Sequence, residues 1–479
     1  MNDELYELTI KQAAELLVKG TISSVDLTKS CLSRIEKMEP EINAFVTICS
    51  EYALKAAASA DKRLKTGKDL TLLTGIPYSL KDVYITKGIQ TTACSNSLRG
   101  YIPQYNATVH KKLSDAGAVL IGKTNCDAFG FGASTEHSDF GVTKNPIDTT
   151  LVPGGSSGGS GAAVAYGGGL FSIGEDTGGS IRCPASFCGI VGLKPTYGLV
   201  SRYGSIAFAS SFDTVGPMTK TVEDNAIVLS TIAGNDPHDA TTTQDSVPDY
   251  YKRLSASLKG KVLGMPKECF GKGLDSAVRN IVEKAINKYE KLGCKVKQIS
   301  LPNTDYGIAV YYVIGPSEAS SNLARYDGFR YGAQSGGKDW KEMIRKTRGS
   351  SFNDEVKRRI MLGTYALSTG YADQYYNKAQ KVRQQLKIDF DKAFEKVDVI
   401  LTPTMPVLPF KIGSKTDDPL QMWLVDTYTA MINPIGLPGL SVPAGCTDKG
   451  LPVGMQLVGN HFSEADLYNF AHVFEADEV

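Results

Sequence analysis

Serine and glycine gather in two short clusters, Pro153–Ser160 (PGGSSGGS) and Gly174–Arg182 (GEDTGGSIR). A serine hydroxyl attacks amide carbonyls when a nearby base removes its proton. Glycine costs folding entropy, so clustered glycines indicate backbone that approaches something closely or adopts conformations closed to other residues. A flexible linker is the alternative, but the apolar run Ala162–Ala165 and the strand-like Leu170–Ile173 lie between the clusters. The sequence therefore predicts two ordered loops at the ends of regular elements.

These clusters resemble the long glycine- and serine-rich motif that defines the amidase signature family. Upstream, Gly75–Asp82 (GIPYSLKD) is similar to the lysine motif of that family, and downstream Cys188–Thr196 (CGIVGLKPT) continues the match. The motifs occur in the family's order, and the likeness extends over nearly the whole chain. The resemblance implies an amidase activity and the α/β fold of that family, a large mixed β-sheet flanked by helices on both faces.

The resemblance also implies roles for individual residues: Lys81 as base, Ser156 as bridging serine after a cis Gly155–Ser156 peptide bond, Ser180 as nucleophile, and Thr177, Gly178 and Gly179 as oxyanion donors through their N–H groups. A lysine is a base only when neutral, which requires a pKa lowered from ~10.4 by burial or by neighbouring positive charge. The largely apolar Ile76–Leu80 predicts such burial. An exposed surface lysine is the alternative for Lys81.

Two other motifs match patterns of unrelated enzymes. Gly117–Thr124 (GAVLIGKT) fits the P-loop pattern, but Ala118–Ile121 is typical of a buried strand, not of a flexible phosphate loop. Gly154–Gly158 (GGSSG) fits the nucleophile elbow of α/β-hydrolases, which needs a strand ahead of it and an acid and a histidine downstream. Thr149–Pro153 is a poor strand, and His472 is expected on a terminal helix in a packing or surface role. Neither ATP binding nor a Ser-His-Asp triad is favoured.

The C-terminal half narrows the resemblance to the glutaminase branch of the tRNA-dependent amidotransferases, through Tyr311–Ile314, Ser317–Tyr331 and Glu355–Gly363. Glutamine carries an α-ammonium and an α-carboxylate besides its amide, so a selective pocket needs an acid and an arginine. By resemblance Asp426 binds the ammonium, Arg359 binds the carboxylate and Tyr311 lines the pocket. Arg358 is expected to point elsewhere, because successive helical residues lie about 100° apart. A solvated charge is the alternative for Arg359 and for Asp426.

The same resemblance implies that glutamine acylates Ser180, that ammonia leaves, and that water then releases glutamate. The ammonia passes to a larger tRNA-binding partner of the amidotransferase, which uses ATP and Mg to convert Glu-tRNA(Gln) into Gln-tRNA(Gln), and a small third partner completes the heterotrimer. This chain itself is expected to need no cofactor or metal and to meet tRNA only indirectly. Two alternatives stay open: a stand-alone amidase acting on another small carboxamide, and a non-catalytic paralogue.

Two positions depart from the family pattern. Glu175 stands where the family usually has a small residue, and Cys183 stands where glutamine is usual. A carboxylate beside the oxyanion loop is predicted to raise the pKa of Lys81 and to weaken it as a base.

The elements that must position these residues alternate between helical and strand patterns. Helices are predicted over Thr9–Lys19, Ser24–Lys37 and Ser276–Lys291, and strands over Ala118–Ile121, Leu170–Ile173, Val399–Leu401, Leu440–Val442 and Met455–Val458. No internal repeat or low-complexity linker interrupts the pattern. We therefore expect one domain over 1–479, with an N-terminal helical layer (1–70), a catalytic glycine/serine-rich core (71–232) and a substrate-pocket and C-terminal part (233–479). Residues 235–260 are the weakest point of that continuity.

Bulk composition restricts the possible partners and compartment. Lys plus Arg number 52 against 51 Asp plus Glu, so the chain has no overall field to hold a phosphate backbone. No stretch of ~18 apolar residues predicts a membrane span, and the acidic start, Met1–Leu5, is unlike a secretory signal, so we expect a cytoplasmic protein. The nine cysteines form no C-x-x-C pair and are expected to be free, mostly buried thiols. The five histidines give little support for a zinc site.

Overall fold

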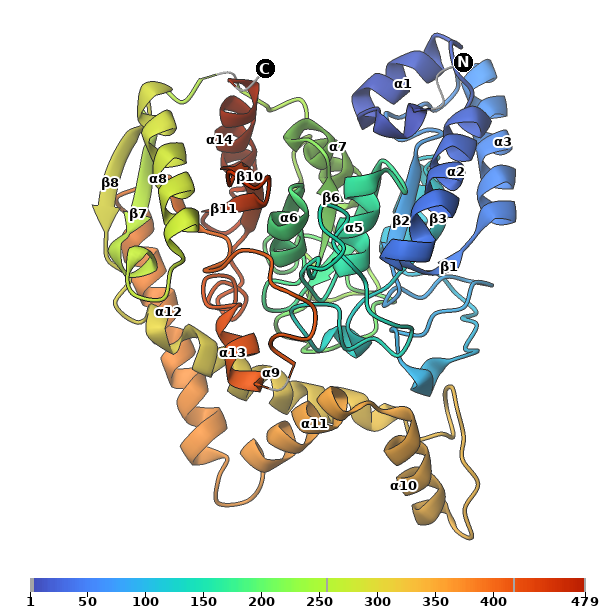
Figure 1. Cartoon of the computed structure of the whole chain (residues 1–479), viewed down its shortest axis with the longest axis vertical. Helices are drawn as coiled ribbons and strands as arrows, with labels where there is room; N and C mark the ends of the chain where they lie inside the picture. The colour runs from blue at the N-terminus through green and yellow to red at the C-terminus, as the bar shows by residue number, and fades with distance from the viewer. Residues whose placement is uncertain (1–3, 256, 417, 478–479) are drawn as a thin grey trace.

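An eleven-stranded mixed sheet forms the centre of the computed structural model, which describes residues 4–255, 257–416 and 418–477 (Figure 1). The acidic start Met1–Asp3 lies outside the described residues. The strand order is β1-β3-β2-β4-β6-β5-β10-β11-β9-β7-β8. The strands are β1 (Phe45–Ile48), β2 (Pro77–Lys81), β3 (Val119–Thr124), β4 (Phe171–Asp176), β5 (Val191–Lys194), β6 (Thr214–Thr219), β7 (Val262–Pro266), β8 (Lys295–Ile299), β9 (Val399–Pro403), β10 (Gly439–Cys446) and β11 (Pro452–Val458).

Parallel and antiparallel pairs both occur, so the predicted mixed sheet is confirmed. Strand β2 runs parallel to both β3 and β4, and β7 runs parallel to β8 and β9, whereas the pairs around β5, β6, β10 and β11 are antiparallel. Every residue of β2, β3, β4 and β6 is buried, as expected for strands covered on both faces. The five predicted strands are confirmed as parts of β3, β4, β9, β10 and β11.

The described residues form fourteen α-helices, several of which flank the sheet. They are α1 (Ile10–Val18), α2 (Ser24–Ile42), α3 (Ser50–Thr66), α4 (Thr108–Asp115), α5 (Gly158–Tyr166), α6 (Arg182–Cys188), α7 (Val222–Ile232), α8 (Ser276–Lys291), α9 (Gly307–Asn322), α10 (Trp340–Ser351), α11 (Asp354–Ala366), α12 (Lys378–Phe394), α13 (Pro419–Leu424) and α14 (Glu464–Ala476). Helix α5 packs on α6 and on the central strands, and α7 packs on α14. Helix α9 packs on both α11 and α12 at one end of the molecule (Figure 1).

The predicted helices are confirmed, except that α2 continues past its predicted end at Lys37 and through Pro40 to Ile42. Their first turns show why they begin where they do. The side chain of Thr9 accepts the N–H of Gln12, and the Gln12 side chain accepts the N–H of Thr9, which makes a capping box at α1. Ser23 and Asp26 make the same arrangement at α2. Helix α8 has the predicted bounds, after the cap Asp275.

Strands from all three predicted segments of the chain join the one sheet. The N-terminal segment, expected to be helical, also supplies β1 at a sheet edge. Residues 233–261, between α7 and β7, contain neither helix nor strand among those that the structure describes. None of the described helices is both long and apolar enough to cross a membrane.

The P-loop-like segment is a buried strand, as predicted. Residues 119–124 form β3, and the Lys123 side chain is fully buried. Its ammonium donates to the carbonyl oxygen of Tyr84 and to Thr91 Oγ1, and lies 3.1 Å from Asp82 Oδ1. This lysine is therefore committed to the core and offers nothing to a nucleotide phosphate.

Replacing Lys123 with methionine is expected to lower the free energy of unfolding by about 3–5 kcal/mol, because the Asp82 carboxylate is left buried without its cation. Urea denaturation measures the change. The matched control is Lys55→Met, since Lys55 pairs with Glu51 in solvent; it is expected to leave the midpoint nearly unchanged. Equal midpoints for the two variants would contradict the structural role of the Lys123–Asp82 pair.

Candidate active site

Lys81 and Ser180 lie at one edge of the sheet because β2 and β4 are parallel neighbours. Lys81 is the last residue of β2, and Asp176 is the last residue of β4, four residues before Ser180. The carboxyl ends of parallel strands lie at one edge of a sheet, where α/β proteins place their ligands. Ser156, in the loop before α5, lies at the same edge, and all three side chains are buried.

The Lys81 ammonium makes three hydrogen bonds. It donates to Ser156 Oγ at 2.7 Å, to Glu175 Oε2 at 3.0 Å and to the carbonyl oxygen of Glu175 at 3.3 Å. The side chain has no solvent exposure. The predicted burial of Lys81 is therefore confirmed, and the exposed alternative is excluded.

A neutral lysine base requires a lowered pKa, but the pKa of Lys81 is raised. Burial lowers the pKa, but the Glu175 carboxylate, with smaller contributions from Cys126 and Asp127, raises it by more, so the net pKa lies above its ordinary value. The predicted effect of Glu175 is confirmed. The expectation that apolar surroundings alone lower the Lys81 pKa is wrong, because a carboxylate lies against the ammonium.

The loop that carries Ser156 has the cis peptide bond implied by the resemblance, between Gly155 and Ser156. A Cβ atom at Gly155 would lie 2.4 Å from Asp127 Oδ2, so only glycine fits. The carbonyl oxygen of Ser156 accepts the N–H of Asp127 at 3.2 Å and the hydroxyl of Thr135 at 3.3 Å. These contacts hold Ser156 Oγ toward Lys81.

Ser180 lies close to this loop. The N–H of Ser157 donates to the carbonyl oxygen of Ser180 at 3.1 Å, which ties the two glycine-serine clusters together. Ser180 is 6% exposed, whereas Ser156 is completely covered. Within the described chain, Ser180 Oγ has no hydrogen bond to another residue. The structure therefore joins Lys81 to Ser156 directly, and the Ser180 hydroxyl makes no hydrogen bond to the described residues.

The Asp176 side chain organises the loop before Ser180, a role that the sequence analysis missed. Its Oδ1 accepts the N–H of Gly179 at 2.8 Å, and its Oδ2 accepts the N–H of Ile181 at 3.0 Å. Arg182, fully buried, pairs with Asp176 at 2.9 Å and also donates to Gln456 and Asn433. Both Asp176 and Arg182 belong to the second glycine-serine cluster, so their presence inside that motif was the available signal.

Two side chains from the C-terminal half cover the glycines of this loop. A Cβ atom at Gly178 would lie 2.5 Å from the ring of Tyr311, and one at Gly179, whose φ is +134°, would lie 2.3 Å from Thr429 Oγ1. Thr429 Oγ1 donates to the carbonyl oxygen of Gly178 at 2.8 Å. Tyr311 is thus placed directly over the loop that leads to Ser180.

Arg359 and Arg358 differ as predicted from their helical positions on α11. Arg359 is buried, with Nε donating to Glu355 Oε1 at 2.6 Å, whereas the Arg358 side chain is 42% exposed and pairs with the other oxygen of Glu355. The Arg359 guanidinium carbon lies 4.8 Å from the ring centre of Tyr312. Its two terminal nitrogens have no hydrogen bond to any described residue, so they can bind a carboxylate.

Asp426 is also buried, and its hydroxyl partner is Tyr312, at 3.3 Å from Oδ2. Burial raises the pKa of Asp426 to about 8, although Arg359 and the Tyr312 hydroxyl both act to lower it. The Tyr312 side chain contacts both charged groups and stacks on Trp423 at 4.3 Å. The alternative of solvated surface charges is therefore excluded for Arg359 and Asp426. Tyr312 and Trp423 also belong to this site, and the sequence analysis did not identify them.

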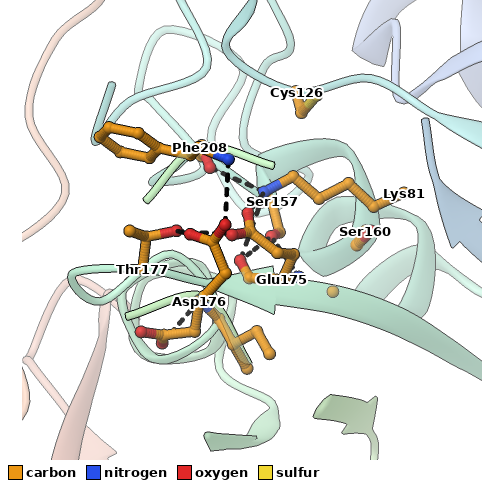
Figure 2. A network of polar contacts seen from close by, with 12 residues as sticks. Lys81, Cys126, Ser157, Ser160, Glu175, Asp176, Thr177 and Phe208 are labelled. Carbon is orange, nitrogen blue, oxygen red and sulfur yellow. Dashed lines mark hydrogen bonds and ion pairs between the residues drawn. The ribbon is translucent and has the colours of Figure 1, made fainter. Parts of the chain in front are cut away.

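A buried polar cluster of carboxyl and hydroxyl groups lies next to Lys81 (Figure 2). Glu175 lies between Lys81 and Thr177, and the Thr177 hydroxyl is 2.5 Å from Glu175 Oε1 and 2.6 Å from Asp213 Oδ1. Asp213 comes from the segment before β6 and was not predicted. The departure of Glu175 from the family pattern was the one signal that pointed to this cluster.

The Ser-His-Asp alternative does not fit the geometry. Ser156 Oγ meets a lysine and not a histidine, and the segment ahead of it makes only an isolated bridge, Leu151 with Lys411. Among the residues that the structure describes, no three His, Cys, Asp or Glu side chains are grouped so as to hold a metal ion. All nine cysteines are free, and eight of them are buried.

Comparison with known proteins gives consistent matches along the chain. The family model described as Amidase matches residues 26–468. Proteins named as the A-type subunit of Glutamyl-tRNA(Gln) amidotransferase, from Thermoanaerobacter pseudethanolicus and Microcystis aeruginosa, are 53% and 51% identical, over 98% of this chain and 96% and 97% of those proteins.

Solved structures match the fold as well as the sequence. The crystal structure of a protein with the same name from Thermotoga maritima gives a TM-score of 0.83 at 39% identity, covering 99% of this chain and 95% of that one. A native peptide amidase from Stenotrophomonas maltophilia gives a TM-score of 0.85 at 30% identity, covering 99% of this chain and 98% of that one. Together with the family model, these matches establish that the chain belongs to the amidase family.

Proposed function

We propose that this chain is the glutaminase subunit of a glutamyl-tRNA(Gln) amidotransferase. Relatives named as that enzyme's A-type subunit, which match nearly the whole chain, are 51–54% identical to it. The observation that carries the proposal is the 2.7 Å hydrogen bond between the buried Lys81 ammonium and Ser156 Oγ, next to Ser157, whose N–H donates to the carbonyl oxygen of Ser180. That arrangement supplies a base, a bridge and a nucleophile for amide chemistry.

In the proposed reaction, Ser180 Oγ attacks the side-chain amide carbon of glutamine. Its proton passes to Ser156 Oγ while the proton of Ser156 passes to neutral Lys81, so the charge that develops at the base is buried and hydrogen-bonded. The reverse transfer protonates the leaving nitrogen, and ammonia departs. Water then attacks the glutamyl ester by the same route and releases glutamate.

The loop geometry reduces the proposed oxyanion donors from three residues to two. The N–H of Gly179 is already donated to Asp176. The N–H groups of Thr177 and Gly178 have no such acceptor in the described chain, so we assign the developing oxyanion to these two. A single preorganised donor of this kind is worth roughly 3 kcal/mol in the transition state.

Substrate selection is assigned to the aromatic and charged residues over the loop. The terminal nitrogens of Arg359 suit the α-carboxylate, and the Asp426 carboxylate suits the α-ammonium. An arriving ammonium favours the ionised form of Asp426, which burial otherwise disfavours. Tyr311, above Gly178, would separate these groups from the reacting amide.

The proposed partners follow from the same assignment. The larger, tRNA-binding partner would use ATP and Mg to form Gln-tRNA(Gln) from the ammonia, and the small third partner would complete the complex. We place the complex in the cytoplasm, since free thiols persist in a reducing compartment.

Replacing Ser180 with alanine is expected to lower ammonia release from glutamine by roughly 10⁴- to 10⁶-fold, and Ser156→Ala is expected to do the same, because the members of such a triad act as a unit. Mass spectrometry of the wild-type protein, quenched during turnover, is expected to find a glutamyl ester on Ser180.

The control is Ser186→Ala, which removes a buried hydroxyl that accepts the N–H of Gly454 and should keep its activity. Ammonia release from other carboxamides but not from glutamine would indicate a stand-alone amidase. No release from the wild type, even with the tRNA-binding and small partners present, would indicate a non-catalytic paralogue.

Replacing Asp426 with asparagine is expected to raise KM for glutamine by about 10- to 100-fold, since a hydrogen bond to a charged group contributes ~1.5–3 kcal/mol. In the wild type, KM should fall as pH rises through about 8, because the carboxyl binds the ammonium only after it ionises. Steady-state assays across this range measure both effects.

The matched control is Asp354→Asn, at a side chain that is 94% exposed on α11. It should leave KM and its pH dependence unchanged. An Asp426→Asn variant that retains the wild-type pH dependence of KM would show that another group binds the ammonium.

A further inference from the structure

The hydrogen bonds of Lys81 describe a protonated amine. An ammonium has three hydrogens and no acceptor site, and the three donors of Lys81 are directed at Ser156 Oγ, the carbonyl oxygen of Glu175 and Glu175 Oε2. To act as a base, Lys81 must first lose one of these protons. Neither a serine hydroxyl nor a peptide carbonyl oxygen can hold an additional proton at neutral pH. Glu175 Oε2 is the one acceptor of the three that can.

The contacts of the other Glu175 oxygen indicate that the cluster holds one proton more than two carboxylates and one hydroxyl would. The Thr177 hydroxyl lies 2.5 Å from Glu175 Oε1 and 2.6 Å from Asp213 Oδ1. A hydroxyl has one hydrogen to donate, so the second of these contacts needs a carboxyl group that donates. Lys81 stabilises the charge on Glu175, which leaves Asp213 as the protonated acid. The cluster therefore runs from Asp213 through Thr177 and Glu175 to Lys81.

The surroundings of the cluster favour this distribution of protons. Asp213 is buried, and burial followed by the charge of Glu175 holds its pKa well above the ordinary value. The Thr177 hydroxyl, the N–H of Ala209 and the charge of Arg202 act in the opposite direction. Cys126 and Asp127 are the other titratable groups that act on Lys81. The nearby phenols of Tyr84 and Tyr311 stay neutral, because burial raises their pKa well above its ordinary value.

Asp213 also connects the cluster to solvent. It lines a surface pocket of about 370 Å³ together with Arg202, Tyr203, His238, Tyr326 and Tyr331. Ser180 is not among the residues that line this pocket. The chain of hydrogen bonds thus has one end at Lys81 and the other at Asp213, which lines this pocket.

We propose that Glu175 is a further catalytic residue of this chain, which takes the proton from Lys81 Nζ and so makes the amine a base, with Thr177 and Asp213 as positioning residues that hold its carboxyl group and connect it to the pocket. The proposal rests on the role proposed above for Lys81. It assigns a function to a residue that departs from the family pattern.

The proton transfers balance without any further reactant. One proton moves from Lys81 Nζ to Glu175 Oε2, which turns an ammonium and a carboxylate into an amine and a carboxylic acid. The Ser180 proton then reaches the amine through Ser156 as the C–O bond forms, and returns by the same path to the nitrogen of the breaking C–N bond. Lys81 is again neutral after ammonia leaves, ready for the attack of water.

The two possible roles of Glu175 give opposite results in a mutant. If Glu175 only holds Lys81 as a cation, removal of the carboxylate lowers the pKa of Lys81 and raises activity at neutral pH. If Glu175 accepts the proton, removal leaves Lys81 with no acceptor and lowers activity.

We expect Glu175→Gln and Glu175→Ser to lower kcat for the carboxamide that the wild type turns over by about 10²- to 10⁴-fold at neutral pH, the usual contribution of a positioned proton acceptor. Activity in both variants should rise with pH, since solvent must then deprotonate Lys81, so the acid limb of the wild-type profile moves to higher pH. Equal or higher activity at neutral pH in both variants would overturn the proposal. Glu223→Gln, which removes a partly exposed carboxylate on α7, is the control.

The Thr177 position tests the connection through the hydroxyl. Thr177→Val removes the hydroxyl at constant shape, and we expect the same displacement of the pH profile as in the Glu175 variants, whereas Thr177→Ser should restore most of the wild-type profile. Identical profiles for the valine and serine variants would contradict the role of the hydroxyl.

Infrared difference spectroscopy of the full chain tests the resting proton without any substrate. At neutral pH the wild type is expected to show the carbonyl band of a protonated Asp213 in addition to that of Asp426, whose pKa is about 8, and Asp213→Asn is expected to lose only the former. Equal protonated-carboxyl bands in the wild type and in Asp213→Asn would overturn the assignment of protons. Because this measurement needs no turnover, a chain that fails to hydrolyse glutamine would contradict the proposed function and still report on the proposed cluster.

Discussion

The arrangement of this site depends on the burial of one amine. Moving an ammonium out of water costs several kcal/mol unless acceptors replace the lost hydration. Lys81 has three such acceptors, and each comes from a loop or strand end that must be held in place. Three features hold these loops and strand ends in place: the glycine at position 155, the parallel pairing of β2 with β4, and the side chain of Asp176.

A second buried lysine shows how much the neighbouring carboxylate matters. Lys194 is as completely buried as Lys81, but it donates to the carbonyl oxygen of Pro195 and makes no ion pair within the described residues. Burial, helped by the positive charge of Arg182, lowers the pKa of Lys194 to about 7. For Lys81 the net direction is upward. Equal burial thus gives opposite shifts, and the Glu175 carboxylate is the difference at Lys81.

Local sequence was enough to find the elements and the central residues, because these depend on pattern and motif. Capping residues located α1 and α2, apolar runs located five strands, and the order of three motifs indicated Lys81, Ser156 and Ser180. The partners of these residues were not accessible in this way. Asp213 lies 36 positions from Thr177, and Asp176 acts through the direction of its side chain, so only the folded backbone brings them together. The apolar stretch before Lys81 suggested a lowered pKa, and only the carboxylate at position 175, on the neighbouring strand β4, indicated the raised pKa that the structure gives.

A buried lysine paired with a glutamate can become a neutral base by a different route from a lysine in apolar surroundings. The pair has no net charge whether the proton is on nitrogen or on oxygen, but only the form with the proton on nitrogen is an ion pair. A medium of low dielectric penalises separated charges, so expulsion of water by a bound substrate shifts the pair toward the neutral amine and the carboxylic acid. In the proposed mechanism the base would become active as the substrate seals the site, and the free protein would keep its lysine protonated and its buried charges balanced.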